Sequence, residues 1–268
     1  MDKEEKIFNL EDEFVKIQKN LEHYLEVLCI DLHSITLSLK NFPKLKEITV
    51  PNPYLSYFLQ RKHDTNSFIY HTKNNSDQIL FRINNDYALS IINIFELHIK
   101  QAYGLMLALR KQISMKLTTA YLKETFSKEM SKYKTLGVLA NEIYEKINKI
   151  DKKIMENEKQ YYEYFENYIL LRNCLAHKNG IISEDEVGLE IRLPVITQDQ
   201  IQKAILGEEK VLNPQTLIRK WKLGEQIKLN LNEVEGIAYG LIKVSFRIIK
   251  HMYKAADKHF EGIEKAKK

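Results

Sequence analysis

Residues that interrupt regular secondary structure are scarce in this chain of 268 residues, which has 9 glycines and 5 prolines. Cysteine is scarcer still: only Cys29 and Cys174 occur, each within an apolar helical pattern. Two such cysteines do not make a disulfide framework, so we expect a reducing, cytoplasmic environment. No apolar run approaches the roughly 18 residues of a membrane helix, and the charged N-terminus lacks the apolar core of a signal peptide. We therefore expect no membrane association.

Motifs of nucleotide-driven and metal-dependent enzymes are also missing from the sequence. It has neither a Gly-x-x-x-x-Gly-Lys loop nor a Gly-x-Gly-x-x-Gly turn to hold phosphates. His63, His71, Glu96 and His98 lack the spacing of zinc ligands. We expect neither a metal ion nor another cofactor.

Apolar residues at helical spacing dominate what the chain does contain. The hydrophobic fraction of 44% suffices for a core, and the abundance of Lys, Glu, Leu and Ile favours helix over sheet. The sequence predicts an all-α fold, an antiparallel helical bundle with a long N-terminal helix. Helices are expected over residues 9–39, 86–111 and 118–132, from Thr135 onward, over 151–177 with Asp151 as cap, and from a cap at Asn232 to the C-terminus.

Two regions depart from the helical pattern. Residues 41–78 contain prolines and a long polar run, which predict an irregular connection, with short strands at 68–70 and 79–81. Residues 188–195 and 226–231 alternate like strands and predict a small antiparallel β-hairpin. We divide the chain into residues 1–78, the N-terminal helix with its connection, and 79–268, the main helical domain.

A concentrated group of polar side chains lies in the last turns of the helix expected to end at residue 177. Residues 171–180 read Leu-Arg-Asn-Cys-Leu-Ala-His-Lys-Asn-Gly, and Gly180 follows where a left-handed residue would end the helix. Asn173 and His177 share one helical face, with Arg172 about 100° away from Asn173. The spacing therefore predicts that a fixed cation, an amide and an imidazole converge.

These residue types suit RNA cleavage without a metal ion. Such cleavage needs a base for the ribose 2′-hydroxyl, an acid for the leaving 5′-oxygen and a cation for the charged phosphorus centre. Histidine gives or takes a proton near neutral pH, and arginine presents a planar fork to phosphate oxygens. Asn173 can orient the ring of His177 or contact RNA, and Lys178 can add a phosphate contact.

The run Arg172-Asn173-x-x-x-His177, with Gly180 in support, resembles the signature of the HEPN superfamily. Active members are metal-independent endoribonucleases of toxin and anti-phage systems. The order of elements is also similar, over roughly residues 80–260: an aromatic-rich stretch, the motif, a β-like excursion and a last helix. The resemblance implies catalytic roles for Arg172, Asn173 and His177 in a HEPN-like bundle.

The resemblance also implies a homodimer, because active members place two motifs across one cleft and a lone histidine lacks a second acid or base. Some branches pair with a nucleotidyltransferase antitoxin that modifies a tyrosine two residues after the histidine. Asn179 occupies that position here, which weakens the expectation of that partner. Another antitoxin or defence-system protein remains a candidate partner, unnamed by the sequence.

A basic stripe on the last helix predicts contact with a polyanion such as RNA. Lys243, Arg247, Lys250 and Lys254 recur at intervals of three and four residues. Alone, such a stripe is typical of the solvated face of a helix.

Purely structural roles remain alternatives for the motif and for its neighbours. The motif can simply satisfy a helix end, and the aromatic stripe Tyr161, Tyr164, Phe165 and Tyr168 is typical of core packing. Cys174, three residues before His177, is more typical of packing than of a nucleophile. The hypothesis is a toxin or abortive-infection endoribonuclease. The alternatives are an inactive HEPN-like domain that binds RNA, nucleotide or protein, and a helical scaffold.

Overall fold

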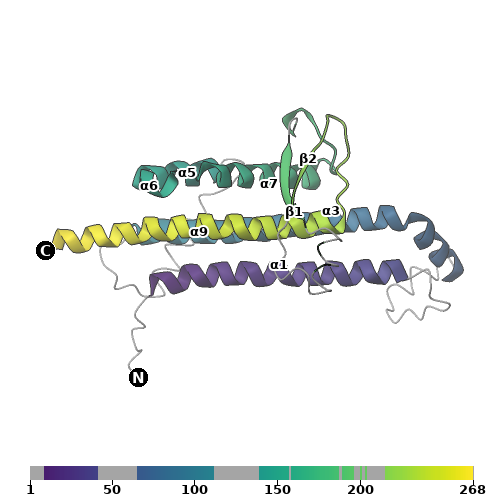
Figure 1. Ribbon diagram of the computed structural model, residues 1–268, viewed down its shortest axis with the longest axis horizontal. Coiled ribbons are helices and arrows are strands. Elements are labelled where there is room, and N and C mark those ends of the chain that lie inside the picture. Colours follow the sequence, from purple (N-terminus) through teal and green to yellow (C-terminus); the bar gives the residue numbers. More distant parts are fainter. Residues whose placement is uncertain are drawn as a thin grey trace, which may run out of the picture.

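A computed structural model describes residues 9–41, 65–111, 139–156, 158–186, 189–195, 200, 203 and 215–267. Within these residues the chain is mostly helical and contains one antiparallel pair of strands, which confirms the predicted helical fold with a small hairpin-like sheet (Figure 1). None of the described helices has both the length and the apolar character that crossing a membrane requires. The expected helix at 118–132 and the start of the helix from Thr135 lie outside the described residues.

Three long helices form the framework of the molecule. They are α1 (Leu10–Asn41), α3 (Thr65–Leu109) and α9 (Leu231–Lys267). The shorter elements are α5 (Leu139–Ile150), α6 (Lys152–Met155), α7 (Lys159–His177), the 3-10 turn η2 (Glu184–Glu186), β1 (Glu190–Val195) and β2 (Gln215–Lys220).

Helices α3 and α9 lie side by side and run in the same direction, so the predicted antiparallel arrangement is wrong for this pair. The side-chain amide of Asn84 donates to the carbonyl of Leu229 over 2.9 Å, just before α9 begins. Toward the other end, Arg110 Nη1 donates to the carbonyl of Ala255 over 3.2 Å. The residues of both pairs are separated by 145 positions, so the register between the helices is the same at both ends.

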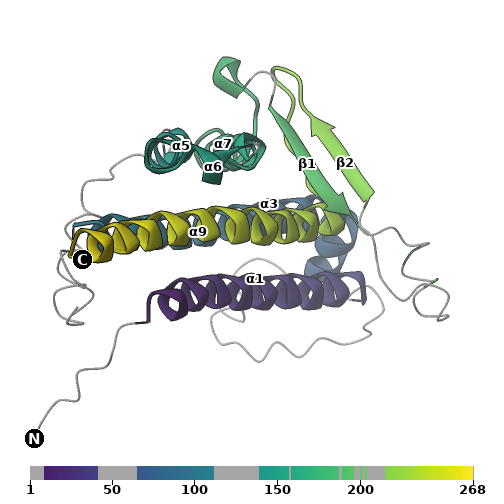
Figure 2. The same cartoon turned by 60° about the vertical axis from the view of Figure 1, so that its left-hand side comes forward.

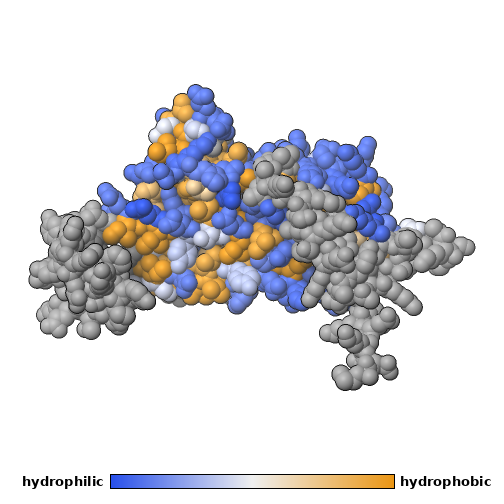
Figure 3. Space-filling model, turned by 180° about the vertical axis from the view of Figure 1, so that it is seen from behind, coloured by the Kyte–Doolittle hydropathy of each residue, from blue (hydrophilic) through white to orange (hydrophobic). Residues whose placement is uncertain are grey.

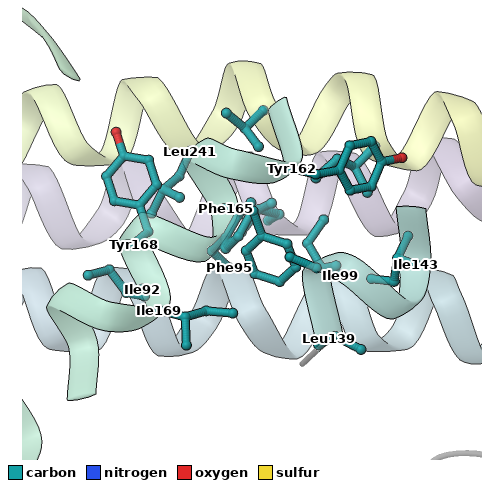
Figure 4. Close-up of a cluster of buried hydrophobic side chains, with 14 of the residues drawn as sticks. Ile92, Phe95, Ile99, Leu139, Ile143, Tyr162, Phe165, Tyr168, Ile169 and Leu241 are labelled. Atoms are coloured by element: carbon teal, nitrogen blue, oxygen red, sulfur yellow. The ribbon is translucent and has the colours of Figure 1, made fainter. Parts of the chain in front are cut away.

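Helix α7 packs against this pair (Figure 4). It runs opposite to α9, because Tyr162 lies near His251 and Tyr168, further along α7, abuts Gly240. The ring of Phe165 meets Phe95 of α3 edge to face, with centroids 5.1 Å apart. Tyr162 lies beside His251 of α9. Both phenylalanines and the surrounding Ile92, Ile99 and Leu241 are fully buried, so the core sits directly beneath the helix that carries the motif.

Helix α1 forms the layer on the other side of α3 and α9 (Figure 2). It runs antiparallel to α9: Phe14 meets Tyr253 edge to face, and His33 Nδ1 lies 3.4 Å from Glu235 Oε1. Apolar residues also gather on the face seen from behind (Figure 3), and Ile30 of α1 is 66% exposed. The bundle therefore buries only one side of α1.

Two glycines of α9 allow β1 and α7 to approach its backbone. A Cβ at Gly236 would lie 2.9 Å from the carbonyl oxygen of Pro194 in β1. A Cβ at Gly240 would lie 2.7 Å from the hydroxyl of Tyr168 in α7. Because real Cβ contacts are longer than this, any other residue would push these elements apart.

The start of α3 contradicts the irregular connection that the sequence predicts over residues 41–78. Residues 65–78 are helical, so the strands expected at 68–70 and 79–81 are wrong, and residue 78, the expected domain boundary, falls inside α3. No glycine or proline occurs between Pro53 and Gly104, so nothing interrupts a helix there. Because no glycine or proline interrupts the helix, it continues through the two short β-prone triplets.

The expected second strand at 226–231 is also wrong, because the partner of β1 is β2, paired from Glu190 with Lys220 to Val195 with Gln215. The alternation at 226–231 arises because Ile227 and Leu229 are buried in a non-strand segment. Asn85 of α3 holds that segment: its amide nitrogen donates to Ile227 O over 2.9 Å, and its amide oxygen accepts from Leu229 N over 3.3 Å.

Two helix caps differ from the prediction. Asp151 does act as a cap, accepting from Lys153 N over 2.9 Å, but it caps the short α6 and the chain breaks before α7. Glu156 is in extended conformation at this break. Neither glycine nor proline occurs there, so the sequence lacks the strongest signals of a helix end. Helix α9 is capped by Asn230, two residues before the expected Asn232. Asn230 and Glu233 exchange side-chain-to-backbone hydrogen bonds in a capping box.

We predict that Gly240→Ala lowers the free energy of unfolding by about 1–3 kcal/mol, because the added methyl group overpacks against Tyr168. Gly262→Ala, on the same helix with open space around it, should be neutral or stabilising by up to about 1 kcal/mol. Urea unfolding of both variants measures the difference, and equal effects would contradict the close packing.

Candidate functional site

The motif ends α7 through two residues in the left-handed conformation. Asn179 has φ of 52° and Gly180 has φ of 73°. The amide of Gly180 then donates to the carbonyl of Cys174 over 3.1 Å. The predicted left-handed glycine at this helix end is confirmed, and it fixes the direction in which the chain leaves the motif.

Arg172 is held by three side chains. Its Nε donates to Oδ1 of Asn93 in α3 over 3.0 Å, and its Nη1 donates to Oδ1 of Asn173 over 2.9 Å. Its Nε also lies 4.0 Å from Oε2 of Glu96. The remaining nitrogen, Nη2, has no partner among the described residues, and 22% of the side chain is exposed. The guanidinium is therefore oriented with one donor edge left for a ligand.

The partners of Arg172 on α3 are residues that sequence reasoning missed. Glu96 was considered only as a metal ligand, and Asn93 and Lys100 were not considered at all. Lys100 Nζ lies 3.5 Å from Glu96 Oε1, so a second cation flanks the same carboxylate. The signal that was available is their spacing of three and four residues, which places three polar side chains on one face of an apolar helix.

The carboxylate of Glu96 is almost entirely buried, with 4% of the side chain exposed. Burial raises its pKa above the ordinary value, and Lys100 and then Arg172 lower it in part. Its Oε2 accepts no hydrogen bond from the described residues. A buried carboxylate in this position stabilises a nearby positive charge and fixes where Arg172 lies.

His177 lies apart from Arg172. Five residues separate them, which is about 140° around the helix. The imidazole is exposed, and the described part of the chain gives it no hydrogen-bond partner. Asn173 bonds to Arg172 rather than to His177. Within one chain the structure thus brings Arg172 and Asn173 together, and leaves His177 pointing toward solvent.

Lys178 and Cys174 complete the motif segment. Lys178 Nζ contacts Ser183 Oγ and pairs with Asp185 Oδ2 over 3.1 Å. Asp185 is 86% exposed, so the pair is weak enough for a phosphate to replace it. Cys174 is fully buried and its Sγ lies 3.3 Å from the carbonyl of Ile181, as expected for a packing residue.

The aromatic stripe of α7 divides into core and surface residues. Phe165 and Tyr168 are buried, as the core interpretation expects. Tyr161 and Tyr164 are half-buried, and each lies beneath an arginine: Arg247 over Tyr161 at 5.6 Å and Arg192 over Tyr164 at 5.8 Å. Two rings of the stripe therefore face cations at the surface.

The basic stripe of α9 lies near the start of α7 rather than at the motif. Arg247 contacts Tyr161 and lies 3.9 Å from Glu158. Arg172 follows Tyr161 by eleven residues, a rise of roughly 16 Å along the helix. Lys243, Lys250 and Lys254 are exposed on the same side of α9. The two groups of predicted RNA contacts are separate surfaces within one chain.

Comparison with models of protein families, with curated proteins and with solved structures found no significant match. Among the described residues, no group of three or more His, Cys, Asp or Glu side chains is arranged to hold a metal ion. What can be said of function therefore rests on the geometry of this chain.

A second polar cluster lies at the start of α7, around the buried His251 of α9. His251 Nδ1 lies 3.1 Å from the hydroxyl of Tyr162, and its Nε2 lies 3.8 Å from Glu158 Oε2. Burial lowers the pKa of His251 to about 4, assisted by Lys254, Arg247 and Lys250. The imidazole is therefore neutral at pH 7, and its Nδ1 is within hydrogen-bond distance of Tyr162.

We predict that His251 makes the fold sensitive to acid. Between its ordinary pKa of 6.5 and about 4 the unfolded chain binds the proton and the folded chain does not, so stability falls as pH falls across this window. The loss from this group should be on the order of 1–3 kcal/mol. Urea unfolding across this pH range should show a shallower dependence for His251→Gln than for the native chain.

The exposed His23 of α1 provides the matched control. His23→Gln should keep the native pH dependence. If the native chain and both variants lose stability equally between pH 6.5 and 4, buried His251 is not the cause.

Proposed function

We propose that this protein is a metal-independent endoribonuclease of the HEPN type, acting as a homodimer in a toxin or abortive-infection system. The observation that carries the proposal is the oriented guanidinium of Arg172, held by α3 at the end of the helix that exposes His177. An arginine that only capped its helix would bond to the helix carbonyls. Its bonds here go to side chains, with Nη2 left over.

The proposed reaction is transfer of the phosphodiester to the neighbouring 2′-oxygen. His177 accepts the proton of the ribose 2′-hydroxyl, and the oxygen attacks phosphorus. The bond to the 5′-oxygen breaks, and a second acid protonates that leaving group. The products are a 2′,3′-cyclic phosphate and a 5′-hydroxyl. Arg172 stabilises the charge on the phosphorus centre, and Lys178 and Lys100 add positive potential around it.

The orientation of His177 supports a site shared between two chains. Because it points about 140° away from Arg172, one chain does not offer both groups to a single phosphate. In a two-fold dimer that places both motifs across one cleft, the exposed His177 of one chain would reach a phosphate held by Arg172 of the partner subunit, and one histidine acts as base while the other acts as acid. This supplies the second proton-transfer group that a single motif lacks.

A second candidate function is an inactive HEPN-like domain that binds RNA, nucleotide or a protein partner. The occupied donors of Arg172 favour it, because the interaction with Asn93 and Glu96 also explains the arginine as a buried counter-charge. In that case the cations at the surface carry the function, and His177 has no role in it.

We predict that the purified protein cuts single-stranded RNA in the presence of EDTA and that His177→Ala reduces the rate by at least about 100-fold, because proton transfer is lost. The melting temperature should stay the same, since the side chain is exposed. Gel analysis of labelled RNA, with detection of the cyclic phosphate, measures both rate and chemistry.

His23→Ala, another exposed histidine, is the matched control and should cut at the native rate. Expression should arrest growth for the native chain and this control, and not for His177→Ala. Equal cleavage by native chain and His177→Ala removes the proposed mechanism. RNA binding without cleavage in any condition favours the second candidate.

We predict a homodimer with a mass about twice the 31.7 kDa of one chain by light scattering. Ala176, exposed next to His177, lies near the expected two-fold axis. Ala176→Cys should therefore form a disulfide between chains under oxidation, whereas Lys265→Cys, at the far end of α9, should not. A monomer at all concentrations at which RNA is cut contradicts the shared site.

A further inference from the structure

The solvent side of α9 alternates exposed aromatic rings with cations. Tyr239 and Phe246 are 41% and 53% exposed. Lys243 Nζ lies over the ring of Tyr239 at 4.5 Å, and Lys250 Nζ lies over that of Phe246 at 6.0 Å. The positions i, i+4, i+7 and i+11 form one straight row along a helix, and Arg247 over Tyr161 lies beside it.

This row carries positive charge without compensation from its own helix. The sequence contains no Asp or Glu between Glu235 and Asp257, yet it contains Lys243, Arg247 and Lys250 there. The rings and cations therefore present a ligand with flat apolar faces at its centre and positive charge at its edges.

A groove of about 430 Å³ between α1 and α9 continues this surface. Phe246, Lys250 and Tyr253 of α9 line one side, and Phe14 and Val15 of α1 line the other. The α1 side also includes the charged residues Glu11, Lys19 and Glu22. Gln18 of α1 also lines the groove and is 7% exposed. Its Nε2 donates to Glu22 Oε1 over 2.8 Å, but its buried Oε1 accepts nothing. A rotation of this side chain would offer the unused acceptor to a ligand in the groove.

We propose that the row Tyr239-Lys243-Phe246-Lys250 and the adjoining α1–α9 groove bind single-stranded RNA, with one base against Phe246 in the groove and its exocyclic amine donating to Gln18 Oε1. The identity of the polymer as RNA rests on the proposed function, whereas binding itself is independent of cleavage. The lysines leave the rings to contact phosphates on either side of the stacked bases.

The exchange is energetically favourable. A cation over an exposed ring contributes a factor of about 2 to 5 to an equilibrium constant, whereas a base stacked on an aromatic side chain contributes about 5 to 150. Each displaced lysine then gains a phosphate contact. The ring therefore interacts more strongly with a base, and the lysine with a phosphate, than the two side chains interact with each other.

Other partners use this surface less well. Duplex RNA presents phosphates but keeps its base faces stacked, which would leave both rings without contacts. A membrane surface needs an apolar helix face, and the apolar face of α9, including Ile237 and Leu241, is fully buried in the core. An acidic peptide would match the lysines, but it has no bases to stack on the rings of Tyr239 and Phe246.

The row also runs toward the motif. Arg247 lies over Tyr161 at the start of α7, and Gly240, next to Tyr239, abuts Tyr168. The strand that binds along α9 from Lys250 to Tyr239 thus follows α7 in the direction of Arg172 and His177. This surface therefore binds a part of the substrate that is distant from the cleaved phosphate.

The test is fluorescence anisotropy with labelled oligoadenylate and oligouridylate, in the His177→Ala background to prevent cleavage. Phe246→Ala should weaken oligoadenylate binding by about 5- to 150-fold. Tyr24→Ala, which removes a 52% exposed ring from α1, should bind normally. Lys243→Gln with Lys250→Gln should flatten the slope of log K against log salt by about 1.4, and Lys265→Gln should leave it unchanged.

Base recognition has its own comparison. Uracil has no exocyclic amine, so oligoadenylate should bind more tightly than oligouridylate. Gln18→Met should reduce this difference in affinity. Equal binding by Phe246→Ala and its parent, or tighter binding of duplex RNA, polyglutamate or vesicles of equal parts phosphatidylcholine and phosphatidylglycerol, overturns the proposal. If oligoadenylate binds as expected but the native chain does not cleave RNA, the binding surface is supported and the proposed nuclease function is contradicted. If the native chain cleaves RNA but Phe246→Ala binds oligoadenylate normally, the nuclease function is supported and the binding surface is contradicted.

Discussion

The packing of α7 across the parallel pair α3 and α9 is the contact on which the rest of the structure depends. Phe165 and Tyr168 anchor α7 in the core, and Gly240 permits the close approach that Tyr168 needs. With these side chains fixed, the rotation of α7 about its own axis is fixed as well. That rotation directs Arg172 toward α3 and His177 toward solvent.

The fold was predictable from sequence where burial follows a regular period. Helices α1 and α9, the second half of α3 and strand β1 were predicted because their apolar residues repeat at 3.6 or 2 residues, and Gly180 because a helix end needs a left-handed residue. The strand at 226–231 was misassigned because its alternation reflects burial beneath Asn85, a residue about 140 positions earlier. The break before α7 contains neither glycine nor proline, so the helical period of the apolar residues outweighed it in the prediction.

In the candidate site, too, residues that are close in sequence were predicted, whereas contacts between distant helices were not. The sequence identified Arg172, Asn173 and His177 from their spacing, but it predicted that all three converge, and only the first two do. The role of Glu96 and Lys100 beside Arg172 was not predicted, because a polar pair on a long apolar helix is ordinary until another helix brings Arg172 to it. A charge such as that of Glu96, buried with few partners, is costly to a fold, and such costs are commonly retained where they serve a function.

The asparagines of α3 join three segments that are remote in the chain. Asn84 and Asn85 hold residues 227–229, and Ile227 in turn donates its amide to the carbonyl of Gly180 over 2.7 Å. The end of the motif helix is thus tied to the entrance of α9 through α3. The three segments form one cooperative unit, whose backbone amides should exchange with solvent together and not one segment at a time. Any ligand that orders α9 would then also reduce local opening of the motif at the end of α7.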